Sequence, residues 1–131
     1  MSADELFRMH DLGVRCIRLH GLYGGSGHDA SLTLNQLEAL AQSKPVQMYG
    51  WSISAQLPLH TWSYLKDAIL NAAQFANTCI VADHNACAIP SDYESTALQD
   101  FLDLLRSGRV YVKISALHRR SPGDIQAMKP I

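Results

Sequence analysis

The sequence predicts an α/β protein of parallel βα units that forms part of a larger barrel. Segments rich in β-branched and apolar residues alternate with segments that repeat apolar residues at helical spacing. Strand starts recur about every 32 residues along the 131-residue chain, the length of a strand with its crossover helix. This order, α-β-α-β-α-β-α-β, favours a parallel sheet with right-handed crossovers.

The elements follow from composition and periodicity. A short helix is expected first, over Ala3–Leu12, ending at Gly13. Further helices are predicted over Leu32–Gln42, Trp62–Phe75 and Leu98–Leu105, where apolar residues share one helical face. The four predicted strands are Val14–His20, Val46–Ile53, Thr78–Asp83 and Arg109–Ser115.

Two parallel architectures fit this order: a doubly wound open sheet, or part of a (β/α)₈ barrel. The loop after the first strand, GLYGGSGHDA, lacks the glycine order of a dinucleotide site and the Lys-Ser/Thr of a P-loop. A long, mobile loop at the mouth of a barrel is expected instead. A complete barrel needs about 250 residues. Residues 1–131 are therefore expected to form one partial domain, with four of eight strands.

Composition limits the binding partners and the cellular location that the sequence leads us to expect. The formal net charge of −1 gives no electrostatic reason to expect nucleic acid or an anionic membrane. No apolar run approaches the roughly 20 residues that span a bilayer, and the first residues do not resemble a secretion signal. A cytoplasmic location is expected. The three cysteines form no Cys-x-x-Cys pair, so reduced thiols in or near the core are predicted rather than disulfides or a zinc knuckle.

The carboxyl ends of the strands are where ligands bind in both architectures. The first strand ends in Arg18 and His20, which share a face with Cys16. Arg18 could hold a substrate carboxylate, or it could pair with a carboxylate inside the barrel. The third strand ends in Asp83 and His84. His84 could ligate a metal or act as an acid or base, and Asp83 could hold a loop or a neighbouring ring.

The other two strand ends carry weaker signals. Lys113 and Ser115 share a face of the fourth strand, and Arg119 and Arg120 follow in what is expected to be a loop. The second strand end offers Trp51, Ser54 and Gln56 for stacking and hydrogen bonding, although a tryptophan such as Trp51 is more often simply part of the core. The remaining histidines are expected to take no part: His10 and His28 should face solvent, and His60 should not be a ligand. His-x-His, H-E-x-x-H and G-x-S-x-G patterns are absent.

Taken together, the strand ends resemble the amidohydrolase-related family of TIM barrels, which includes 2-pyrone-4,6-dicarboxylate lactonase-like hydrolases and metal-dependent decarboxylases. Three stretches carry the resemblance, in order: LGVRCIRLH, IVADHNAC and VYVKISALHRRS. They are closest in character to fungal members of the family. The resemblance implies that the chain corresponds to strands three to six of the barrel.

The resemblance also implies roles for individual residues. His84 would match a histidine that binds metal in metal-dependent members and lies in the catalytic site of metal-free lactonases; Asp83 is the expected catalytic neighbour. Arg18 and Arg119 would match arginines that bind a substrate carboxylate, and His20, Lys113 and Ser115 are expected to line the same substrate site. A divalent metal, zinc or manganese, is implied for metal-dependent members, and none for lactonase-like ones. Cys16, His20 and His118 depart from the family pattern, so no single substrate transfers.

The implied function is hydrolysis of a C–O bond of a lactone, or of a C–N bond, in a small carboxylated substrate. Decarboxylation at the same site is the alternative, and a non-catalytic remnant or small-molecule binding module is a third reading. The family's first-strand His-x-His and its last-strand Asp lie outside these residues, so the chain by itself is expected to be inactive. Open barrel edges predict self-association.

Overall fold

The computed structural model describes residues 2–21, 27–121 and 123–124. Four strands form one sheet in the order β1-β2-β3-β4, and every neighbouring pair is parallel. The strands are β1 (Cys16–His20), β2 (Ser52–Gln56), β3 (Ile80–Ala82) and β4 (Val110–Val112). The predicted α/β fold of parallel units is therefore confirmed. Much of the glycine-rich loop predicted to be mobile lies outside the described residues.

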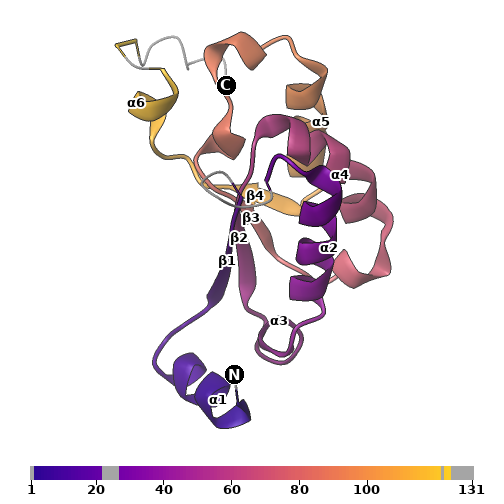
Figure 1. The fold of residues 1–131 in the computed structure, drawn as a ribbon, viewed down its shortest axis with the longest axis vertical. Coiled ribbons are helices and arrows are strands. Elements are labelled where there is room, and N and C mark those ends of the chain that lie inside the picture. Colours follow the sequence, from indigo (N-terminus) through magenta and orange to yellow (C-terminus); the bar gives the residue numbers. More distant parts are fainter. Residues whose placement is uncertain (1, 22–26, 122, 125–131) are drawn as a thin grey trace.

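A layer of helices covers one side of this sheet (Figure 1). The helix α4 (Leu59–Asn71) packs against α5 (Thr96–Arg106) on one flank and contacts α2 (Ala30–Ala41) on the other. The shorter elements are α1 (Ala3–Asp11), α3 (Lys44–Tyr49) and α6 (Leu117–Arg120), with 3₁₀ turns at Ala73–Phe75, Asn85–Cys87 and Pro90–Asp92.

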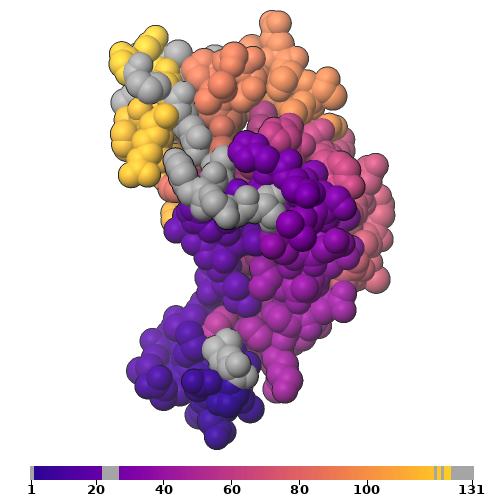
Figure 2. All heavy atoms as spheres, in the orientation of Figure 1, coloured from indigo at the N-terminus to yellow at the C-terminus, as the bar shows by residue number. Residues whose placement is uncertain are grey.

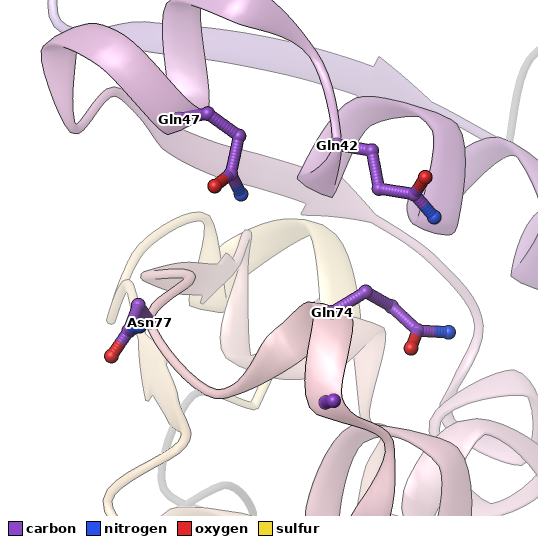
Figure 3. A pocket seen from close by; sticks show the side chains of 5 residues that line it. Gln42, Gln47, Gln74 and Asn77 are labelled. Atoms are coloured by element: carbon purple, nitrogen blue, oxygen red, sulfur yellow. The ribbon is translucent and has the colours of Figure 1, made fainter.

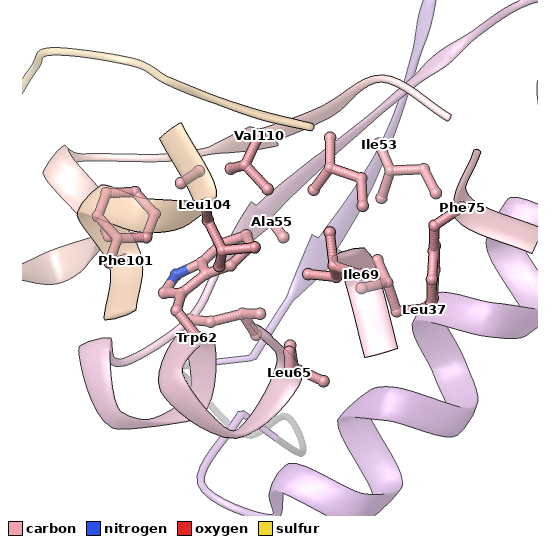
Figure 4. Packing of buried hydrophobic residues seen from close by; sticks show 14 of the residues in the cluster. Leu37, Ile53, Ala55, Trp62, Leu65, Ile69, Phe75, Phe101, Leu104 and Val110 are labelled. Carbon is pink, nitrogen blue, oxygen red and sulfur yellow. The ribbon is translucent and has the colours of Figure 1, made fainter. Parts of the chain in front are cut away.

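The pleat of the strands divides the sheet into an apolar and a polar face. Ile53, Ala55, Ile80 and Ala82 point toward the helices and have no exposed surface. Trp62, Leu65 and Ile69 of α4, with Leu104 of α5, pack onto them, as Figure 4 shows. This core fixes the direction of the strands and so sets where their carboxyl ends lie.

Side chains that accept hydrogen bonds cap the amino ends of α1, α2 and α5. Ser2 and Glu5 form a capping box at α1, in which the Ser2 hydroxyl accepts from the Glu5 amide. Asp29 caps α2 by accepting from the Leu32 amide, and Ser95 caps α5 in the same way. Each cap satisfies an amide that has no partner inside the helix.

A charged group ties α4 to α5 on the outer surface. Lys66 Nζ lies 2.8 Å from a carboxylate oxygen of both Asp100 and Asp103. Hydrogen bonds from Lys66, with further ones from Ser63 to Asp100 and from Arg106 to Asp103, lower the pKa of both carboxyl groups. These carboxylates therefore stay charged further into acid in the folded chain than in the unfolded one.

The prediction of a strand over Val46–Ile53 is wrong in its first half. Residues Lys44–Tyr49 form the helix α3, and the strand begins only at Ser52. Pro45 occupies the first turn, where its fixed φ suits a helix, and Gly50 ends the helix in a left-handed conformation with φ 64°. The β-branched and aromatic side chains of this stretch suggested a strand, but the proline and glycine decide the backbone.

Other boundaries also differ from prediction. The helix predicted over Trp62–Phe75 begins at Leu59 and breaks at Ala72, whose extended ψ of 133° separates α4 from a 3₁₀ turn. The strands β3 and β4 are shorter than predicted, and Arg119 lies in α6 rather than in a loop. Among the helices of the described residues, none is long and apolar enough to cross a bilayer.

The structure also decides predictions for Trp51, His10 and the cysteines. Trp51 is part of the core, which was the alternative to a role at the strand end, because it precedes β2 and is buried. His10 is half-buried rather than solvent-facing: it stacks on Tyr49 at 4.6 Å, and its Nδ1 accepts from the indole of Trp51 at 3.0 Å. All three cysteines are free thiols as predicted; Cys87 is buried, whereas Cys16 and Cys79 are exposed, so of the thiols expected in or near the core only Cys87 is in it.

Candidate active site

The polar face of the sheet gathers the predicted site residues from separate strands. The register places Arg18 beside Ser54, Ser54 beside Val81, and Val81 beside Tyr111. Residues two positions further along continue the same face toward the carboxyl ends. That row is His20 on β1, Gln56 on β2, and Asp83 and Lys113 just beyond β3 and β4. Parallel strands therefore bring these side chains to one edge of the sheet.

Asp83 is the centre of this group. Its side chain is 3% exposed, and its Oδ2 lies 3.2 Å from Arg18 Nη2. Lys113 Nζ lies 4.0 Å from the other oxygen, Oδ1, which is buried and accepts no hydrogen bond in the described part of the chain. The 4.0 Å separation makes Lys113 an ion-pair partner rather than a hydrogen-bond donor. A buried carboxylate thus holds two cations that are themselves half exposed.

Arg18 is held from two sides. Its Nη2 donates to Gln56 Oε1 at 3.1 Å and forms an ion pair with Asp83 Oδ2 at 3.2 Å. Pairing with an internal carboxylate was one of the two alternatives for this arginine, and the structure has that pair. Because half of the Arg18 side chain remains exposed, its other N–H groups face the open side of the sheet.

His84 lies on an unusual turn. Four successive residues, His84 to Cys87, have φ between 52° and 58°, the left-handed region that residues other than glycine rarely adopt. The Asn85 amide donates to the Lys113 carbonyl, and its side-chain amide donates to the Ser115 carbonyl. These bonds fasten the turn to the end of β4. Backbone strain of this kind is concentrated at functional sites.

Ser115 contacts His84 directly. Its Oγ lies 2.7 Å from His84 Nδ1, so the hydroxyl orients the ring. Asn85 was not expected as a site residue; the tolerance of asparagine for left-handed backbone, directly after a strand, is the signal that could have identified it. The structure therefore places two contact groups at the ends of β1, β3 and β4, Arg18–Asp83–Lys113 and His84–Ser115, which together form the strand-end cluster.

The other two expected substrate-binding residues are His20 and Arg119. His20 is exposed at the end of β1, and Arg119 is exposed on α6. In Figure 1, α6 lies beyond the carboxyl ends of the strands, on the side opposite α2 and α4. The side chain of Arg120 is not among those described.

The described residues do not form a complete metal site. No group of three or more His, Cys, Asp or Glu side chains among them could hold an ion. One nitrogen of His84 is engaged by Ser115, and the Asp83 carboxylate is turned to Arg18 and Lys113. His84 alone cannot supply the three protein ligands that a catalytic zinc needs.

Two pockets lie away from this cluster. A pocket of about 330 Å³ is lined by amide side chains between α2, α3 and the end of α4; Figure 3 shows Gln42, Gln47, Gln74 and Asn77 around it. It contains no ionisable group. A second pocket, of about 320 Å³, lies near the starts of α4 and α5, where the rings of His28 and His60 stack at 5.7 Å. His28 is exposed as predicted.

A single sheet of four parallel strands with helices on one face is an α/β fold consistent with part of a TIM barrel. The family model described as Amidohydrolase (Amidohydro_2) matches residues 1–130. The chain belongs to the amidohydrolase family. No curated protein and no solved structure is matched.

Proposed function

We propose that the chain supplies part of the active site of a hydrolase that cleaves a C–O bond of a lactone, or a C–N bond, in a small carboxylated substrate. The observation that carries this proposal is the cluster of Arg18, Asp83, His84, Lys113 and Ser115 at the strand ends. Family membership supports hydrolysis in general. The bond and the substrate class rest on the resemblance of the strand ends to lactonase-like members of the family.

The charges of the cluster favour an anionic substrate. Two cations, Arg18 and Lys113, pair with the single carboxylate of Asp83. A third cation, Arg119, is exposed and follows Lys113 closely in the sequence. Arg18 and Arg119 would bind a carboxylate through paired N–H groups, and Lys113 through a single ammonium.

His84 is the proposed acid or base of the reaction. Its ring is oriented by Ser115, and an imidazole titrates near neutral pH, which suits proton transfer to a leaving oxygen or nitrogen. A zinc or manganese ion would need ligands beyond this chain's described residues, and a lactonase-like reaction would need none. No step is assigned to a metal.

Substrate binding by the chain tests the proposal directly. Phthalate, a small aromatic dicarboxylate, is titrated against the ¹⁵N-labelled chain, and shifts are expected at Lys113, Ser115 and Arg119. Arg119→Gln should weaken binding about tenfold, the loss of one charge-assisted contact of roughly 1.4 kcal/mol. Arg106→Gln removes an equally exposed arginine from α5 and should leave binding unchanged. Equal effects of both variants would contradict the proposal.

A turnover assay tests the expectation that the chain alone is inactive. Lactones and aromatic acids are incubated with the chain, with and without zinc or manganese. No hydrolysis is expected. Turnover that disappears in His84→Ala would refute this inactivity, and release of carbon dioxide instead of a ring-opened acid would favour a decarboxylase.

A further inference from the structure

The pocket of about 320 Å³ lies where three loops that follow strands meet. His28 comes from the segment between β1 and α2, His60 from the start of α4, and Asp92 from the loop between β3 and α5. Figure 2 shows the purple, magenta and orange surfaces of these parts of the chain side by side at one end of the molecule. Loops after the strands are where parallel α/β proteins bind ligands. The volume of this three-loop pocket lies at the lower end of ligand pockets, roughly 300–1,000 Å³, so it suits a small molecule.

The walls of the three-loop pocket are apolar and aromatic. Pro58 and Leu59 form a buried wall, and Ile89 is 41% exposed at the rim. The imidazoles of His28 and His60 stack with their centroids 5.7 Å apart and their planes 29° apart, and both residues are exposed. Each ring has one face turned away from the other, on which a further flat ring can stack. A ligand with one aromatic ring therefore suits these walls.

Asp92 supplies the charged group of the three-loop pocket. Its Oδ2 accepts from the Ile89 amide at 2.9 Å, whereas Oδ1 accepts no hydrogen bond from any residue that the structure describes. The other ionisable side chains of the lining are His28, His60 and Cys87. Imidazoles and thiols are ordinarily mainly neutral at pH 7.5. The lining therefore presents one full negative charge, on a carboxylate with an oxygen open to a donor.

The surroundings of the three-loop pocket add negative charge. Residues 21–31, 57–62 and 84–97 include no lysine or arginine, and their other charged side chains, Asp29 and Glu94, are acidic. The amino ends of α4 and α5 act in the opposite direction, since each carries about half a positive charge. Three carboxylates outweigh these two helix ends, and Asp92 alone among them lines the pocket. The balance favours a cationic ligand.

We propose that the three-loop pocket binds a small aromatic monocation, with its ring on the imidazole pair of His28 and His60 and its cationic group at Asp92 Oδ1. The strand-end cluster is proposed to bind an anion through Arg18 and Lys113. The two sites thus select ligands of opposite charge. The three-loop pocket is a second binding site, and its ligand does not depend on the reaction proposed above.

Three compounds with the same ring and different charge test this selection. Benzylamine, benzyl alcohol and benzoate are titrated at pH 7.5 against the ¹⁵N-labelled chain. Benzylamine should give saturable shifts at the amides of His60, Ile89 and Ala97, with a dissociation constant at least tenfold lower than that of benzyl alcohol. Benzoate should give no saturable shift there. Equal affinity for benzylamine and benzyl alcohol, or saturable binding of benzoate at these amides, would overturn the proposal.

A matched pair of variants tests the role of Asp92. Asp92→Asn removes the charge but keeps a side-chain oxygen that can accept from the Ile89 amide. It should weaken benzylamine binding about tenfold and leave benzyl alcohol unaffected. Glu94→Gln removes an exposed acid two residues away that does not line the pocket, and it should change benzylamine binding less than twofold. Equal effects of the two variants would contradict the assignment of Asp92.

The two proposed sites can be judged separately in these titrations. Shifts at Lys113, Ser115 and Arg119 on adding phthalate report on the strand-end cluster, and shifts at His60, Ile89 and Ala97 on adding benzylamine report on the three-loop pocket. Loss of one response leaves the other intact. The comparison of the three compounds uses the wild-type chain, so it decides the proposal even if Asp92→Asn does not fold.

Discussion

Removing the guanidinium of Arg18 tests how the candidate site is held together. Arg18→Gln leaves the Asp83 carboxylate 3% exposed, with Lys113 at 4.0 Å as its remaining cation. One of its oxygens already lacks a hydrogen bond within the described structure. The variant therefore leaves a buried anion poorly compensated, and the folded state should lose stability.

The loss in free energy of unfolding caused by Arg18→Gln should lie between two known limits. Exposed ion pairs contribute about 0–1 kcal/mol, whereas removing one partner of a buried pair costs about 3–5 kcal/mol. Here the anion is buried but the arginine is 52% exposed, so water already screens part of the attraction. Lys113 keeps part of the compensation. We expect Arg18→Gln to reduce the free energy of unfolding by about 2 kcal/mol.

Arg106→Gln is the matched control for this measurement. Arg106 lies 3.0 Å from Asp103, a shorter separation than the 3.2 Å between Arg18 and Asp83. The Asp103 side chain is 48% exposed, however, and water replaces the lost arginine. Urea unfolding of both variants, at one chain concentration, should show a clearly larger loss for Arg18→Gln. Equal losses would refute the argument that burial of the carboxylate, rather than distance, decides the cost.

Two further predictions follow from the described contacts. Lys66→Met removes the shared partner of Asp100 and Asp103, whose pKa values are lowered in the folded chain. The difference in free energy of unfolding between Lys66→Met and wild type, measured by urea unfolding, should be constant above about pH 4, the ordinary carboxyl pKa. It should shrink at lower pH, because Asp100 and Asp103 become protonated there and lose their attraction to Lys66. A difference that stays unchanged in acid would contradict this assignment. Ala86→Gly relieves a left-handed φ of 52°, whereas Ala82→Gly weakens a strand, and both alanines are fully buried. In thermal melts Ala82→Gly should therefore be the more destabilising by about 1–2 kcal/mol, and the reverse order would count against strain at the turn.

The fold was largely predictable because its signals are local and repeated. Alternation of apolar stretches with helical periodicity identifies all four strands, and the order of elements identifies a parallel sheet. The error at Val46–Ile53 arose where two local signals disagree. Pro45 and Gly50 fix the backbone of α3, whereas side-chain type gave only the weaker preference. The break at Ala72 depends on tertiary packing, and neighbouring alanines carry no sign of it.

The members of the site were predictable, but their contacts were not. Strand-end position alone nominates Arg18, Asp83, His84 and Lys113. Which of them touch depends on the register of three strands, and the sequence of each strand says nothing of its register with the next. The left-handed turn adds a second difficulty, because after Asp83 the pleat no longer decides where a side chain points. The roles of these residues in binding and catalysis stay predictions.

A buried carboxylate with two half-exposed cations is a poor way to gain stability, since desolvation of Asp83 offsets much of the attraction. Its value to the site is the placement of Arg18 and Lys113. The double variant Arg18→Gln/Asp83→Asn separates these two effects. It contains no uncompensated buried charge, so its free energy of unfolding should return to within about 1 kcal/mol of wild type, well above that of Arg18→Gln alone. Phthalate binding should nevertheless stay at least tenfold weaker than in wild type, because one cation is gone and Lys113 has lost its counter-ion. If stability and binding were restored together, the cluster would have no part in holding an anionic substrate.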